Sequence, residues 1–140
     1  MKTVLCSVTD KSGIVPFISN LTTILKVEVL ASGGTRRTLE EGNVTTTEIA
    51  EYTGAPECFG GRVKTLHPKI AGGILLRPDV DTKEALDLGI AAIDLVVCNL
   101  YNFHEALGGA IEELVEQMDI GGVTLIRAAV KNYQTTTVVV

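Results

Sequence analysis

The sequence contains no tryptophan, few aromatic residues and no long hydrophobic run. Of its 140 residues, 46% are hydrophobic but only 4% are aromatic, so aliphatic side chains must supply the core. No apolar run approaches the roughly 18 residues of a membrane-spanning helix, and the apolar stretch near the amino terminus is too short for a signal peptide. We therefore expect a cytoplasmic protein with no membrane partner.

Positive charge and cysteine are also scarce. The formal net charge is -5, whereas nucleic-acid-binding proteins normally carry a basic face, so we expect no nucleic-acid partner. Cys6, Cys58 and Cys98 are odd in number and far apart, which argues against a disulfide framework and against a zinc site built on paired cysteines. Cys6 and Cys98 lie in apolar runs and are predicted to be reduced core residues. We expect no bound metal.

Short apolar runs that favour strands alternate with helical patterns along the chain. Strands are predicted at residues 3–8, 28–32, 43–49, 93–101 and 135–140. Helices are predicted at residues 12–26, 35–42, 83–88, 105–118 and 123–131. This alternation is typical of an α/β fold with three layers, in which helices cover both faces of a central, mostly parallel sheet. Since no linker divides the chain, we expect one domain.

Polar sequence follows three of the predicted strands. TDKSG follows Val8, SGGT follows Ala31 and NLYNF follows Cys98. In an open parallel sheet, ligands bind beyond the carboxyl ends of the strands. These three segments should therefore meet at one edge of the sheet and form a binding site there.

The segment SGGTRR, residues 32–37, is predicted to join a strand to a helix. Gly33 and Gly34 would let a ligand approach the backbone, Thr35 offers a hydroxyl, and the helix start offers unpaired N–H groups. This combination favours a phosphate site, although an ordinary capped turn is the alternative. Neither GxxxxGK[ST] nor GxGxxG is present. Lys11, after the first predicted strand, would place a positive charge beside the same anion. The alternative is a solvated lysine with no ligand.

The segment GGRVKTLHPKIAGG, residues 60–73, gathers positive charge between two glycine pairs. Arg62 offers a forked hydrogen-bond donor for an anion, Lys64 could stabilise a developing oxyanion, and His67 could donate or shuttle a proton. The glycine pairs suggest hinges or close approaches, and Pro68 stiffens the middle. We expect a ligand-binding loop, with a mobile surface loop as the alternative.

Six segments occur along the chain in an order that is similar to a known family: SVTDKSG, ASGGT, GGRVKTLHPKI, CNLY, MDIGGVTLIRAAVKN and TTTVVV. Together they resemble the inosine monophosphate (IMP) cyclohydrolase domain of the bifunctional purine-biosynthesis enzymes, which also carry a transformylase domain. The resemblance implies a methylglyoxal synthase-like fold. It also implies dehydrative ring closure of 5-formamidoimidazole-4-carboxamide ribotide, a small-molecule purine ribotide, to IMP. That chemistry requires no cofactor, because cations, N–H groups and an acid/base pair suffice.

The resemblance also implies roles for individual residues. The family's nucleotide-binding positions correspond to Ser7, Lys11, Ser32, Gly34, Thr35 and Arg62. Its ring-closure positions correspond to Lys64, Tyr101, Asp119 and Lys131. Further substrate contacts are expected from neighbouring residues of the same segments, namely Thr9, Gly33, Thr65, Asn99, Gly121 and Gly122.

Each ring-closure residue has a specific expected role and a structural alternative. Lys64 would stabilise the oxyanion, and Tyr101 would donate to the departing oxygen, unless it is a half-buried aromatic at a strand end. Asp119 would accept the amide proton or hold Lys64 in place, unless it caps a helix. Lys131 ranks below Lys64, because a continuous helix over residues 122–131 would be about 14 Å long. Both ends of such a helix could not touch a small substrate, and Lys131 could instead match the helix dipole.

Three departures from the family pattern bear on function. The sequence stops at Val140, so we expect a cyclohydrolase-like domain over residues 1–140 without the family's C-terminal part and without the transformylase domain. A partner or a homodimer would then cover exposed apolar sheet. Asn102 stands where the family has proline, and Ala71 where it often has histidine. The alternative function is a non-catalytic nucleotide-binding module of the same fold, but Lys64, Tyr101 and Asp119 together favour catalysis.

Overall fold

One five-stranded parallel sheet, in the order β3-β2-β1-β4-β5, forms the centre of the molecule. The computed structural model describes residues 2–140. The strands are β1 (Thr3–Ser7), β2 (Glu28–Ala31), β3 (Thr47–Glu48), β4 (Leu95–Cys98) and β5 (Thr137–Val139). This arrangement confirms the predicted α/β class and the parallel sheet.

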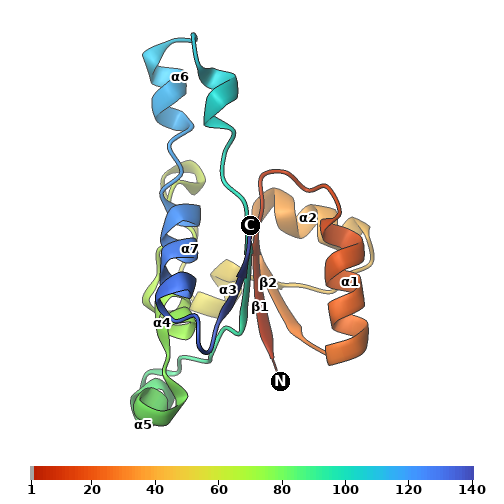
Figure 1. Ribbon diagram of the computed structural model, residues 1–140, viewed down its shortest axis with the longest axis vertical. Coiled ribbons are helices and arrows are strands. Elements are labelled where there is room, and N and C mark those ends of the chain that lie inside the picture. Colours follow the sequence, from red (N-terminus) through yellow and green to blue (C-terminus); the bar gives the residue numbers. More distant parts are fainter. Residues whose placement is uncertain (1) are drawn as a thin grey trace.

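Helices cover both faces of this sheet (Figure 1). On one face lie α1 (Ile14–Leu25) and α2 (Gly33–Glu41). The other face carries α4 (Pro68–Leu75), α5 (Pro78–Leu88) and α7 (Gly121–Lys131). The short helix α3 (Ile49–Thr53) contributes Ile49 to the core on that same face. The three predicted layers are thus confirmed.

The central strands are apolar on both faces because each face packs against helices. Along β1, Val4 and Cys6 join the core under α1 and α2, whereas Leu5 joins the core under α4 and α7. Side chains alternate between the faces of a strand, and a parallel sheet buried on both sides therefore reads as a continuous apolar run. This packing explains why the central strands could be predicted from apolar runs alone.

An arm, residues 101–118, extends away from the sheet (Figure 1). It contains the 3₁₀ helix η2 (Phe103–Ala106) and the helix α6 (Ile111–Glu116). Gly108, with φ of 91°, lies between them, so the helix predicted over residues 105–118 is interrupted. Among residues 2–140, no helix is long and apolar enough to cross a membrane.

Helix α1 begins after Gly13, which has φ of 73°, and no side chain caps it. The Asp10 carboxylate accepts a hydrogen bond from Ser12 N at 2.9 Å in the preceding turn. The prediction of a loop over residues 60–73 was wrong for its second half. Residues 68–75 form the helix α4 rather than a loop. Pro68 occupies its first turn, where a missing N–H has no cost. Gly72 and Gly73 therefore lie inside a helix and are not hinges.

Candidate active site

A cavity of about 750 Å³ lies at the carboxyl ends of the central strands. Residues from five separate segments meet there. This agrees with the expectation that ligands bind beyond the carboxyl ends of parallel strands. The predicted site residues that line it are Ser7, Thr9 and Lys11, Ser32, Gly34 and Thr35, Arg62, Lys64 and Thr65, Asn99 and Tyr101, and Asp119, Gly121 and Gly122. The fold thus brings most of the predicted site together.

The start of α2 gathers groups that could bind an anion, namely the amides of residues 33–35 with Lys11 and Ser32, and we call this group the anion site. The first backbone bond of the helix runs from Arg36 N to Ser32 O at 3.3 Å, so the three preceding amides have no partner within the helix. Ser32 stands at the cap position, but its hydroxyl makes no capping bond. Free amides and a free hydroxyl at the positive end of a helix favour binding of an anion.

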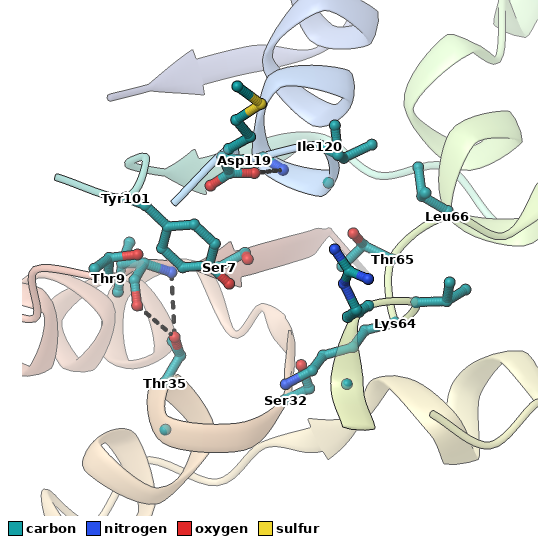
Figure 2. A pocket seen from close by; sticks show the side chains of 18 of the residues that line it. Ser7, Thr9, Ser32, Thr35, Lys64, Thr65, Leu66, Tyr101, Asp119 and Ile120 are labelled. Atoms are coloured by element: carbon teal, nitrogen blue, oxygen red, sulfur yellow. Dashed lines mark hydrogen bonds between the residues drawn. The ribbon is translucent and has the colours of Figure 1, made fainter. Parts of the chain in front are cut away.

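Two lysines approach this helix start where glycine leaves room. A Cβ atom added to Gly34 would lie 3.3 Å from Lys11 Cε, and one added to Gly33 would lie 3.2 Å from Lys64 Nζ. Figure 2 shows the Lys64 side chain reaching toward Ser32. Gly33 itself lies beneath Lys64 and is not among the residues that line the cavity. Two ammonium groups thus reinforce the positive end of α2.

Thr35 has a structural role that the sequence did not predict. Its hydroxyl accepts a hydrogen bond from Val8 N at 3.1 Å and donates one to Val8 O at 3.0 Å (Figure 2). The residue is only 5% exposed. The hydroxyl therefore ties α2 to the end of β1, and Thr35 can offer a ligand its backbone amide rather than its side chain.

Asn99 fixes the loop that follows β1. Its Oδ1 accepts from Thr9 N at 2.6 Å and from Asp10 N at 3.1 Å, and its Nδ2 donates to Asp10 O at 2.8 Å. The Lys11 ammonium donates to Thr9 O at 2.9 Å. Asn99 thus shapes the cavity wall, and through this loop it places Lys11 beside α2.

The cations of the 62–64 segment pair with carboxylates. Arg62 Nη2 lies 3.2 Å from Glu116 Oε1 of the arm, and Lys64 Nζ lies 3.6 Å from Glu57 Oε1. Neither glutamate could be predicted from the sequence, because no motif links either one to its partner. The carboxylate beside Lys64 therefore belongs to Glu57, and Asp119 does not hold Lys64 in this structure.

Asp119 lies two residues before the first residue of α7 and lines the cavity as well. Its Oδ1 accepts from Gly122 N at 2.6 Å, so the helix-capping alternative holds in the structure. A Cβ atom added to Gly122 would lie 2.8 Å from Leu100 Cδ2 and 2.9 Å from the same Asp119 oxygen, which explains the need for glycine there. Figure 2 shows Tyr101, which is 49% exposed, on the same side of the cavity as Asp119.

Two candidate residues lie away from this arrangement. Lys131 ends α7, a continuous helix of 11 residues, and roughly 14 Å of helix separates it from Gly122 at the cavity. Lys131 does not line the cavity. His67 caps α4, where its Nδ1 accepts from Lys69 N at 3.1 Å, and it faces a separate cavity of about 270 Å³. The expected proton transfer by His67 therefore has no support in this geometry.

The apolar part of the cavity wall was not predicted. Side chains without chemical function complete it, namely Val8, Phe59, Val63, Leu66, Val115, Met118 and Ile120. Phe59 is 81% exposed and has φ of 54°. Apolar residues of this kind carry no motif, and only the folded chain reveals that they share one cavity.

The buried cysteines are protonated thiols near neutral pH. Burial raises the pKa of Cys6 to about 12. Burial, with a smaller effect of the Asp119 carboxylate, raises the pKa of Cys98 to about 11. Both are free and buried, as predicted, and neither is suited to act as a nucleophile. Within residues 2–140, no group of three His, Cys, Asp or Glu residues is arranged to hold a metal ion.

Comparison with known proteins gives consistent matches over this fold. The model of the family described as MGS-like domain matches residues 13–124. The bifunctional purine biosynthesis protein PurH of Synechocystis sp. is 50% identical over 140 aligned residues, which cover 96% of this chain and 27% of that protein. PurH of Rippkaea orientalis is 47% identical over 139 residues, with the same coverage of 96% and 27%.

The chain thus spans about a quarter (27%) of the length of the curated relatives that it matches. Among solved structures, the one titled crystal structure of ForH superposes with a TM-score of 0.82 at 35% identity. That match covers 96% of this chain and 70% of the other.

Proposed function

Because the chain belongs to the family of MGS-like domains and is homologous to the purine-biosynthesis enzyme PurH, we propose that it is an IMP cyclohydrolase. It would close the ring of 5-formamidoimidazole-4-carboxamide ribotide to form inosine monophosphate and water. One observation carries the proposal: a single cavity joins the anion site at α2 with Lys64, Tyr101 and Asp119.

The anion site would bind the 5′-phosphate of the ribotide. The free amides at the start of α2 and the Ser32 hydroxyl would donate to its oxygens, and Lys11 would supply positive charge. Arg62, whose side chain is 65% exposed, would exchange Glu116 for the ligand, since an exposed ion pair costs little to break. With the phosphate fixed, the imidazole end of the ribotide would extend toward Tyr101 and Asp119.

Ring closure joins the carboxamide nitrogen to the formyl carbon. This nitrogen is a weak nucleophile because its lone pair is delocalised into the carbonyl. As the new N–C bond forms, the formyl oxygen gains negative charge, which the Lys64 ammonium would stabilise. Asp119 would accept the proton that the nitrogen loses. Tyr101 would donate a proton to the former formyl oxygen, which gives a hydroxyl group. This hydroxyl would take up the proton held by Asp119 and leave as water when its bond to carbon breaks. The formamide nitrogen then forms a double bond to that carbon and returns its own proton to Tyr101.

Asp119 is suited to this role because its two carboxylate oxygens have different surroundings. Oδ1 accepts from Gly122 N at 2.6 Å and is thereby fixed in direction. The hydrogen bonds of the described residues give Oδ2 no partner, so it can accept a proton from the substrate. The Asp119 side chain can therefore bond the first turn of α7 through Oδ1 and act as a general base through Oδ2.

A non-catalytic nucleotide-binding module is the second candidate. One observation favours it: Lys131, one of the four residues that the family resemblance implies for ring closure, lies outside the cavity. A binding module would need the anion site but not the joint placement of Lys64, Tyr101 and Asp119. That joint placement makes catalysis the stronger proposal.

The proposal can be tested by adding the formylated ribotide to the purified chain and following ultraviolet absorbance against buffer. Calorimetric titration with inosine monophosphate would run in parallel. We expect turnover together with product binding. Tight binding without turnover would favour the binding module, whereas absence of both would contradict the two candidates.

A further inference from the structure

Glu57 and Lys64 are neighbours because a tight turn folds the chain back on itself. Cys58 N donates to Val63 O at 3.1 Å, and Val63 N donates to Cys58 O at 3.3 Å, as in an antiparallel strand pair. The next residues outward on the two sides are Glu57 and Lys64. Directly opposite residues of such a pair project to the same side, so the turn itself places the carboxylate beside the ammonium.

The turn has a fixed shape that leaves room for this pair. Phe59, Gly60 and Gly61 have φ of 54°, 65° and 89°, and this left-handed backbone favours glycine. A Cβ atom added to Gly61 would lie 2.7 Å from Lys64 Cε and 3.4 Å from Glu57 Oε2. Gly61 is therefore needed for the turn and also for the passage of the lysine side chain.

The Lys64 ammonium lies between the Glu57 carboxylate, which attracts it, and the positive end of α2, which repels it. Lys64 Nζ is 3.6 Å from Glu57 Oε1 and 3.2 Å from the position of a Cβ atom on Gly33, at the positive end of α2. A helix start repels a cation, and Lys11 approaches the same helix start at Gly34. A free lysine side chain would rotate away from this position, and the Glu57 carboxylate opposes that rotation.

Glu57 acts from outside the cavity, whereas Lys64 lines it. The two side chains are 36% and 33% exposed, respectively. In contrast, Arg62 and Glu116 are 65% and 63% exposed, which is typical of a weak surface pair. The better shielded pair is thus the one that holds the proposed oxyanion-stabilising group.

We propose that Glu57 is a positioning residue that holds the Lys64 ammonium over the anion site. The catalytic part of this inference rests on the proposed cyclohydrolase function, but the positioning itself does not. Glu57 has no contact with the reacting atoms in this account. Its loss should therefore lower kcat through Lys64 and change KM and product binding less, because Lys11, Ser32 and the α2 amides would still bind the anion.

The test compares Glu57→Ala, which removes the carboxylate, with Glu57→Gln, which keeps an oxygen acceptor without charge. Glu51→Gln, an exposed glutamate in the first turn of α3, is the matched control. We expect kcat to fall about tenfold in the alanine variant, since transition-state stabilisation by Lys64 is weakened. The glutamine variant should fall less, and the control should match the wild type.

Nuclear magnetic resonance of the lysine Cε–H signals supplies a readout that needs no turnover. Lys64→Arg assigns the Lys64 signal. In the wild type, the two Cε protons should be inequivalent because the side chain is held, and in Glu57→Ala they should merge. An unchanged Lys64 signal in folded Glu57→Ala would overturn the proposal, whatever the kinetics show. A merged signal in a chain that lacks cyclohydrolase activity would support the positioning and reject the proposed function.

Discussion

At the scale of single residues, the site concentrates positive charge in a chain whose net charge is -5. Lys11 and Lys64 come from segments more than fifty positions apart in the sequence, yet both reach the start of α2. The helix amides add to the same field. A small anion can approach all of these groups at once, whereas a long polyanion would also meet the acidic surface.

Asp119 offers a prediction that separates its charge from its helix-capping bond. In Asp119→Asn, the side-chain oxygen can still accept from Gly122 N, but the group can no longer take a proton. We expect kcat to fall at least about 100-fold, as for loss of a general base, with little change in the melting temperature. Steady-state kinetics and thermal unfolding measure the two effects. Normal turnover in Asp119→Asn would remove Asp119 from the chemistry.

Thr35 offers a prediction about stability. In Thr35→Val, the shape is kept, but Val8 N and Val8 O lose their partner in a buried place. We expect the free energy of unfolding to fall by about 1–3 kcal/mol, the cost of unpaired buried polar groups. Urea unfolding would measure it. Thr23→Val, at an exposed hydroxyl that donates to Ser19 O, is the control and should change stability far less.

Residues that follow predicted strands could be assigned to the site from sequence, because the carboxyl ends of parallel strands share one edge. Ser7, Lys11 and Ser32 are examples. Glu57 and Glu116 could not be assigned, because their pairing depends on a tight turn and on the path of the arm. The structural roles of Asp119 and Thr35 could not be predicted either. They depend on individual hydrogen bonds, to Gly122 N and to the Val8 backbone, that no sequence pattern specifies.

At the scale of elements, the central strands were predictable and the helix α4 was not. Strands buried on both faces are continuous apolar runs, and such runs are easy to recognise. The segment that contains α4 holds Pro68, Gly72 and Gly73, which together suggest a loop. It is nevertheless helical because Pro68 lies in the first turn, His67 caps it, and close packing requires the glycines.

The two adjacent glycines of α4 give a matched prediction. A Cβ atom on Gly73 would lie 2.6 Å from the Ala91 carbonyl oxygen, whereas one on Gly72 would meet only the flexible Ile90 side chain at 3.1 Å. We expect Gly73→Ala to destabilise the fold by about 1–3 kcal/mol through overpacking. Gly72→Ala should be near neutral, because the better helix propensity of alanine offsets a small clash. Equal effects in urea unfolding would contradict this packing account.

At the scale of the whole molecule, the two cores beside the sheet bury two of the three cysteines. Cys6 and Cys98 lie in the two cores on opposite faces of the sheet, whereas Cys58 lies exposed in the turn beside the cavity. The raised pKa values of Cys6 and Cys98 keep them as thiols far above neutral pH. The thiolate is the reactive form, so the fold protects two of the three cysteines.

Thiol titration tests this distribution. With Ellman's reagent at pH 8, we expect one thiol per native chain to react quickly, from Cys58, and all three after denaturation. Cys58→Ser should abolish the fast reaction and leave the total at two after unfolding. Rapid reaction of more than one thiol in the native chain would mean that the cores open much more easily than their packing indicates.

The central claim is that one cavity of this chain both binds the ribotide and closes its ring through Lys64. The most direct measurement is the initial rate of ring closure at saturating formylated ribotide for the wild type and Lys64→Ala side by side. We predict turnover in the wild type and a loss of about 100- to 1,000-fold in the variant, as for removal of an oxyanion-stabilising group, with the fold intact by circular dichroism. Equal rates in the two folded proteins would contradict the account.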